Sequence, residues 1–256
     1  MLPPEVVNFI ANKYGNLPIN VQEYPIHSVV RFAASVTAGP PVSYAIDTAA
    51  RVAFSYGVNG DMAPAGRAGV LATQADTNIQ NPGQTRDQAD VLIYGMACFL
   101  MPGSEGSLIG DVWREVDIQI ATNSDTTIPA GTLENYPAPG GLFGSALSQI
   151  RIPSIDTTGA ADGGPGVAQP FASNGNPIAG SFRSFENPIF WAGLSSGPDS
   201  NLQVIFTPRR PIVRNAPLAR PAAPGIGVYT PPSAAFVDVR VALLAATIKR
   251  RGVNAG

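Results

Sequence analysis

Residues 91–101 read VLIYGMACFLM and contain no charged side chain. In an extended strand, successive side chains point to opposite faces, so both faces of this segment would be apolar. Such a strand must be covered on both sides, as in the middle of a two-layered β protein. A buried helix is the alternative, which Asp87 and Asp90 would favour as a first turn and Gly95 opposes in the middle. We expect a central strand.

Strict alternation along this strand divides its side chains into two sets. One set comprises Val91, Ile93, Ala97, Phe99 and Met101, and the other comprises Leu92, Tyr94, Met96, Cys98 and Leu100.

Alternating or apolar patterns predict further strands along the chain. They cover residues 29–37, 42–47, 51–58, 112–122, 201–208 and 236–248, with fragments at 147–152 and 181–191. In the third of them, Val52, Phe54, Tyr56 and Val58 would share one side. Residues 59–90 and 123–200 are expected to be mostly long loops, because turn residues are dense there.

The composition favours a β protein with many turns and a neutral surface. The 256 residues include 27 Gly and 25 Pro, and only 13% are charged, about half the usual share. A neutral surface lowers the solubility of a free monomer but suits a protein covered by copies of itself. The net charge of −2 gives no overall attraction to nucleic acid.

Metal and cofactor chemistry has little support in the sequence. Cys98 and His27 are the only cysteine and histidine, so neither a disulfide framework nor a usual transition-metal ligand set can form within the chain. Glycines at 57, 60 and 66 match no phosphate-binding motif. We expect no cofactor, no secretion signal at Pro3–Pro4–Glu5, and no membrane span.

Residues 1–15 predict a helix outside the β body. Val6, Phe9, Ile10 and Tyr14 fall on one face at helical spacing. A helix of about twelve residues is marginal alone, so this face must dock on something. The partner is either the chain's own body or a neighbouring subunit or membrane surface, and residues 16–27 would form an extended arm.

Two basic segments follow later in the chain. Arg209, Arg210 and Arg214 lie in a proline-rich stretch of the kind that lies extended across a neighbour. Lys249, Arg250 and Arg251 close the last strand, either as a solvated end or as a basic group on an inner face. Three charges are too few to predict nucleic-acid binding.

Glu115 and Asp117 are candidates for an acid/base pair. On one face of a strand they would lie about 7 Å apart, which could mimic a glycosidase carboxylate pair. The alternative is a solvated strand face.

The pattern as a whole predicts an all-β fold, an antiparallel β-sandwich of jelly-roll type. Residues 1–27 would form the N-terminal helix and arm, 28–251 the jelly roll with its long loops, and 252–256 a tail. A single jelly roll is preferred to a double one, because the expected strands number only about eight to ten.

The chain resembles the jelly-roll major capsid proteins of tailless icosahedral viruses and bacteriophages. The resemblance lies in the N-terminal helix and arm (MLPPEVVNFIANKYG), short strands, long Gly/Pro/Asn loops, a neutral surface and the closing strand FVDVRVALLAATIKRR. It implies a virion protein made in the host cytoplasm that is not an enzyme. It also implies trimeric capsomers, contacts with other capsid proteins, and termini that face the interior, near the genome or an internal membrane.

Two other functions remain open. A β-sandwich binding module for a receptor or carbohydrate would need no self-association. A jelly-roll glycoside hydrolase would use Glu115 and Asp117, and a clustered aromatic platform would support it, but Trp113 and Trp191 are the only tryptophans.

Overall fold

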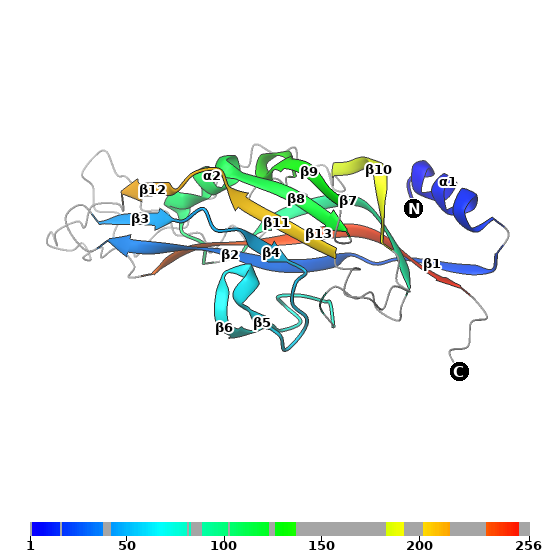
Figure 1. Ribbon diagram of the computed structural model, residues 1–256, viewed down its shortest axis with the longest axis horizontal. Coiled ribbons are helices and arrows are strands. Elements are labelled where there is room, and N and C mark those ends of the chain that lie inside the picture. Colours follow the sequence, from blue (N-terminus) through cyan, green and yellow to red (C-terminus); the bar gives the residue numbers. More distant parts are fainter. Residues whose placement is uncertain are drawn as a thin grey trace, which may run out of the picture.

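The protein is mostly β, with antiparallel sheets and one helix at the N-terminus (Figure 1). The computed structural model describes residues 2–15, 17–37, 42–80, 82, 89–101, 103–122, 126–136, 183–191, 202–215 and 234–250. The predicted strand fragment at 147–152 and the tail at 252–256 lie outside these ranges.

The predicted N-terminal helix is confirmed as α1, Pro4–Tyr14. Proline at the first helical position loses no hydrogen bond, and Glu5 in the first turn and Lys13 in the last suit the helix dipole. Gly15 ends the helix at a φ of 56°, and its N–H donates to the carbonyl of Ala11.

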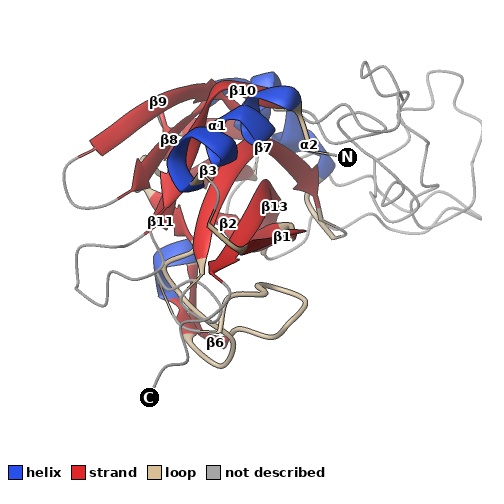
Figure 2. Ribbon diagram, turned by 90° about the vertical axis from the view of Figure 1, so that its right-hand side faces the viewer, coloured by secondary structure: helices blue, strands red, loops and turns tan. Residues whose placement is uncertain are grey.

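A seven-stranded sheet forms the larger layer and curls around the core (Figure 2). Its order is β10-β7-β13-β2-β3-β12, and β1 pairs with the far end of β13. The strands are β1 (Ile19–Glu23), β2 (Ile26–Thr37), β3 (Ser43–Ile46), β7 (Asp90–Leu100), β10 (Arg183–Trp191), β12 (Ile212–Asn215) and β13 (Ala235–Arg250).

The expected extended arm forms part of this sheet. β1 and β2 share one register along β13, from Ile19 opposite Arg250 to Ala34 opposite Ala235. Pro25 separates the two strands because it has no N–H to donate. The Tyr24 N–H still donates to the Ala245 carbonyl across the gap. β1 and β2 together therefore run along the whole of β13.

The central strand predicted at 91–101 is confirmed as β7, which lies between β10 and β13. Its two predicted faces are wrong beyond Gly95. Leu244 pairs with Gly95 and Ala245 with Ile93, so Tyr94 is an extra residue in the ladder. Such a bulge reverses the side-chain alternation: Val91, Ile93, Met96, Cys98 and Leu100 share the main core.

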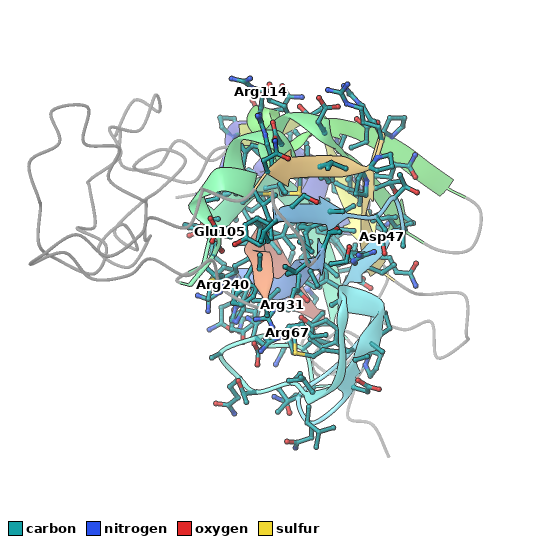
Figure 3. All side chains as sticks on the ribbon, turned by 90° about the vertical axis from the view of Figure 1, so that its left-hand side faces the viewer. Arg31, Asp47, Arg67, Glu105, Arg114 and Arg240 are labelled. Carbon is teal, nitrogen blue, oxygen red and sulfur yellow. The ribbon has the colours of Figure 1, made fainter. Side chains whose placement is uncertain are left out.

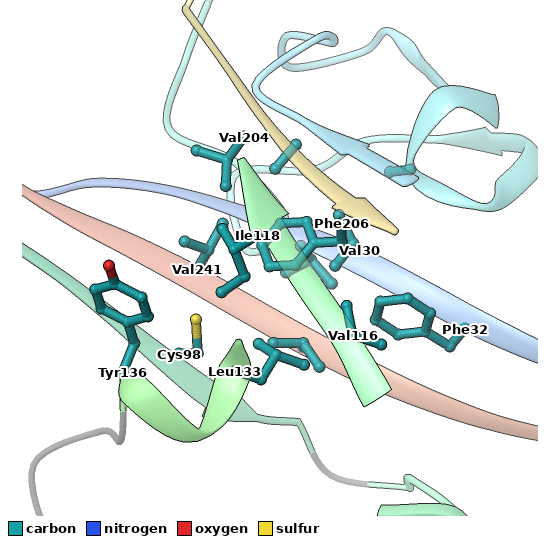
Figure 4. Close-up of a cluster of buried hydrophobic side chains, with 14 of the residues drawn as sticks. Val30, Phe32, Cys98, Val116, Ile118, Leu133, Tyr136, Val204, Phe206 and Val241 are labelled. Carbon is teal, nitrogen blue, oxygen red and sulfur yellow. The ribbon is translucent and has the colours of Figure 1, made fainter. Parts of the chain in front are cut away.

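A four-stranded sheet forms the second layer, in the order β4-β11-β8-β9. Its strands are β4 (Arg51–Ala53), β8 (Val116–Thr122), β9 (Thr126–Thr132) and β11 (Leu202–Pro208). The two layers enclose a common core, where Phe32 of β2 meets Phe206 of β11 edge-on, with ring centroids 6.5 Å apart (Figure 4).

The strand predicted at 112–122 is correct only from Val116 onward. Residues 106–115 form the helix α2, Gly106–Glu115. Its buried side chains, Leu108, Ile109, Val112 and Trp113, follow helical spacing and pack in the main core. Trp113, expected on a polar strand face, is therefore buried.

The strand predicted at 51–58 ends at Ala53, because Phe54 has a φ of 65° and its N–H donates to the Ser28 Oγ. Phe54 and Tyr56 are buried, whereas Val52 and Val58 are only half-buried. The four side chains therefore do not share one face of a strand.

The two predicted loops contain regular structure. Within 59–90 lie β5 (Asp61–Met62), the 3₁₀ turn η1 (Ala63–Ala65) and β6 (Arg67–Leu71), which make a two-stranded sheet. Gly66 has a φ of 86° there, and a Cβ would collide with the Arg31 carbonyl. Within 123–200 lie β9, the 3₁₀ turn η3 (Leu133–Asn135) and β10, which confirms the fragment expected at 181–191.

Four strand pairs are nested in the sequence. β2 pairs with β13, β4 with β11, β7 with β10, and β8 with β9. Within each sheet, two of these pairs lie side by side: β7 also pairs with β13 in the larger sheet, and β8 also pairs with β11 in the smaller one. β3 precedes β4 in the chain and β12 follows β11, and β3 and β12 pair with each other in the larger sheet. The two chain segments that pair as β4–β11 therefore continue, still paired, into the other sheet.

Candidate functional site

The predicted assembly face of α1 lies against the chain's own sheet. Val6, Ile10 and Tyr14 are buried, and Phe9 is half-buried. They form a second apolar cluster, separate from the main core, with Leu92, Tyr94, Ala246 and Ile248 of β7 and β13. Within a single chain the helix therefore docks on its own body, and a role of these four residues in assembly stays a prediction.

Aromatic and cationic contacts fix the helix over β10. The rings of Phe9 and Phe190 are 6.0 Å apart and tilted by 33°. The Lys13 Nζ lies 3.1 Å from the centroid of the Phe190 ring. A cation over an aromatic face is stabilising, so Lys13 adds to the apolar docking.

Two tyrosine–carboxylate pairs tie the N-terminal segment to β7. The Tyr14 hydroxyl donates to Oδ2 of Asp90 over 2.6 Å in a buried position. Tyr94, the bulged residue, is hydrogen-bonded to Glu23 of β1, and burial followed by this carboxylate raises the pKa of Tyr94. Both α1 and β1 are thus bonded to the same strand.

The arginines predicted as assembly contacts form three ion pairs on the molecule's surface. Arg209 binds Asp117 (2.6 Å) and Arg210 binds Glu115 (2.7 Å). Arg214 holds Asp111 through two nitrogens, and its Nη2 lies 2.7 Å from Oδ1. We call these three pairs the arginine ladder; it joins residues 209–214 to α2 and the start of β8.

The ladder changes the interpretation of Glu115 and Asp117. They do not face the same side of one strand, because Glu115 ends α2 and Asp117 belongs to β8. Each carboxylate is bound by a different guanidinium. The two carboxylates therefore do not have the shared strand face on which the hypothesis of a glycosidase pair depended.

The basic end is continuous with the sheet. Lys249 pairs with Asn20 and Arg250 with Ile19 in the β1–β13 ladder. The Lys249 side chain is exposed, and Arg251 lies outside the described residues. An inner-face role for Lys249, Arg250 and Arg251 stays a prediction.

The lone cysteine and histidine occupy different environments. Cys98 is fully buried in the main core, and burial raises the pKa of its thiol strongly. His27 is half-buried at the start of β2, where Nε2 lies 3.3 Å from the Gln74 carbonyl oxygen. Among the described residues, no three His, Cys, Asp or Glu side chains are grouped so that they could hold a metal ion.

Sequence reasoning missed the partners of the charged residues. Asp111, Asp90 and Glu23 carried no recognisable motif, and their partners lie far away in the chain, 103 positions in the case of Arg214. Only the opposite charges of the two segments, mainly acidic at 111–117 and basic at 209–214, could have suggested that they meet.

No known protein family model, curated protein or solved structure matches this chain. Within the described ranges, none of the helices has both the length and the apolar character needed to span a lipid bilayer.

Proposed function

We propose that this protein is a structural shell subunit, a single jelly roll that assembles into trimeric capsomers of an icosahedral virion. The observation that carries the proposal is the nesting of four antiparallel strand pairs across two sheets. A long hairpin of eight strands rolled onto itself produces this pairing, which is the pattern of a jelly roll found in viral capsid and lectin domains.

The sheet orders support a single jelly roll. β2, β13, β7 and β10 are neighbours in one sheet, and β4, β11, β8 and β9 form the other. The first strand of this set pairs with the last, the second with the seventh, the third with the sixth and the fourth with the fifth. β3 and β12 continue the second pair around the edge, and β1 continues the first.

Surface chemistry favours a shell over a free module, since fold alone does not decide function. Charged residues make up 13% of the chain, and interface cores are depleted of charge. Val213 on the edge strand β12 is 60% exposed and Leu17 beside α1 is 54% exposed. Such positions would be covered by neighbouring copies in a shell.

The remaining parts of the proposal concern partners. The chain would contact copies of itself and other capsid proteins, with the arginine ladder near a subunit boundary. The basic end at 249–251 would face a packaged genome or an internal membrane. The protein would act in the virion after synthesis in the host cytoplasm, with no catalytic reaction, cofactor or small-molecule substrate.

Chemical cross-linking with electron microscopy tests this function. We expect the full-length native protein to give cross-linked species of up to three chains at low concentration, and closed particles when concentrated. A single uncross-linked chain under all conditions would contradict the shell and favour the binding module. Hydrolysis of a polysaccharide by the wild type, lost when Glu115→Gln and Asp117→Asn are combined, would favour the enzyme.

A further inference from the structure

The turn at residues 57–60 carries an asparagine followed by a glycine, and the backbone accounts for both. Asn59 has a φ of 66°, in the left-handed region that asparagine adopts more readily than most residues with a side chain. A Cβ on Gly60 would lie 3.0 Å from the Gly57 carbonyl oxygen, which is tighter than ordinary contact, so the close approach favours glycine.

The same pair of residues is chemically reactive. The backbone nitrogen of Gly60 can attack the side-chain carbonyl carbon Cγ of Asn59, and glycine has no side chain to hinder this attack. An N–C bond forms, the bond from Cγ to Nδ2 breaks, and the side-chain nitrogen leaves as ammonia with the proton of the Gly60 amide. Water then opens the resulting ring at either carbonyl. The products are aspartate, or isoaspartate with Cβ inserted into the main chain.

Backbone hydrogen bonds hold the peptide units on both sides of this pair. The Asn59 N–H donates to the Ala72 carbonyl (2.8 Å), and the Gly60 N–H donates to the Gly57 carbonyl (2.9 Å). The Gly60 carbonyl accepts from the Ala72 N–H (2.9 Å). Attack on Cγ requires the Gly60 nitrogen to give up its proton and the peptide unit to rotate about ψ of Asn59. While these bonds are in place, the turn cannot make that rotation.

The turn lies at the periphery of the molecule, where it can open without loss of the main core. Asn59 is exposed and Gly60 is half-buried. The turn leads into the hairpin of β5 and β6, which lies below the sheets in Figure 1 and away from Arg114 in Figure 3. Local opening of such a segment costs less free energy than global unfolding.

We propose that Asn59 is a site of spontaneous modification to aspartate and isoaspartate, which the closed turn protects and an opening of the turn exposes. The isoaspartate product lengthens the main chain between the Asn59 N–H and the Gly60 carbonyl, which both bond Ala72 in the closed turn. The two bonds cannot then form together. Modification therefore converts a transient opening of the turn into a permanent one.

Peptide mapping by mass spectrometry tests the site. The folded full-length protein and a synthetic peptide of residues 52–67 are incubated in the same neutral buffer. We expect Asn59 to be converted at least about tenfold more slowly in the folded protein than in the peptide, because only the open turn reacts. In urea that unfolds the protein, the protein and the peptide should react at the same rate. Asn174–Gly175 lies outside the described residues, and trypsin releases it on a different fragment.

A matched variant separates the effects of the two products. Asn59→Asp supplies the aspartate product without the longer main chain, and aspartate also tolerates the left-handed region. Its Ala72 amide should keep the wild-type protection against hydrogen exchange. The isoaspartate form, separated by chromatography, should lose that protection by at least about tenfold.

Two results would overturn the proposal. One is conversion of Asn59 in the folded protein as fast as in the peptide. The other is wild-type protection of the Ala72 amide in the isoaspartate form. The rate comparison needs no variant to fold, and neither readout depends on assembly.

Discussion

The Tyr14 hydroxyl and the Asp90 carboxylate, 76 positions apart, form a buried hydrogen bond of 2.6 Å between α1 and the first residue of β7. Tyr14→Phe deletes this bond and leaves the ring in place. We expect the free energy of unfolding to fall by about 1.5–3 kcal/mol, as for a bond to a charged group. Urea unfolding measures it. Tyr24→Phe is the control, since its hydroxyl forms no hydrogen bond with any residue that the structure describes; a similar loss in both variants would contradict the assigned role.

The docking of α1 predicts different costs for neighbouring positions of the helix. Ile10 is buried in the second apolar cluster, whereas Val7 is 49% exposed. Ile10→Ala should lower the free energy of unfolding by about 2–4 kcal/mol, and Val7→Ala by less than about 0.5 kcal/mol. Both are measured by urea unfolding. Equal small effects would mean that the helix does not dock on its own sheet in solution.

The bulge at Tyr94 predicts which aromatic side chains contribute most to the stability of the core. Phe32 is fully buried, but Phe99 lies on the opposite face and is half-buried, which strict alternation along β7 did not foresee. Phe32→Ala should cost about 3–5 kcal/mol, and Phe99→Ala less than half as much. Thermal and urea unfolding compare them. The reverse order would place the bulge elsewhere.

The buried thiol of Cys98 should be chemically silent in the native protein. Burial raises the pKa of the thiol, and the thiolate is the reactive form. A thiol reagent followed by absorbance should find no reactive group under native conditions and one per chain in denaturant. Rapid reaction of the native protein would show that β7 opens readily.

The arginine ladder is predicted to affect assembly more than the stability of the single chain. Arg210 is exposed, so Arg210→Ala should lower the free energy of unfolding by less than about 1 kcal/mol. Arg114, another exposed arginine paired with Glu134, is the matched control outside the predicted contacts. If the ladder lies at a subunit boundary, Arg210→Ala reduces the mass of the assembled species measured by light scattering, while Arg114→Ala does not. Identical masses for both variants and the wild type would remove the ladder from the assembly surface.

Much of the fold could be predicted because its pattern is local. The helix α1, the central strand β7 and the alternation in β2, β11 and β13 follow from spacing alone. α2 was missed because Val112 also continues the alternation of Val116, Ile118 and Ile120, so one residue fits both periods. The short strands β5 and β6 lack apolar alternation, so the sequence predicts a loop there.

The candidate sites were harder to predict, because they depend on contacts between distant segments. The bulge at Tyr94 reverses the faces of β7, and only Gly95 beside it hints at an irregularity. His27 was recognised as the lone histidine, but its place beside Arg240 and the turn at Gln74 depends on the β2–β13 register. The partners of Arg209, Arg210 and Arg214 likewise follow from the β8–β11 pairing.

The mass of the native full-length protein in solution, measured by light scattering over a range of concentrations, tests the central claim most directly. A shell subunit should give a species of three chains that grows into a particle of fixed, much larger mass as the concentration rises. A constant mass of one 26.5 kDa chain at every concentration would contradict it.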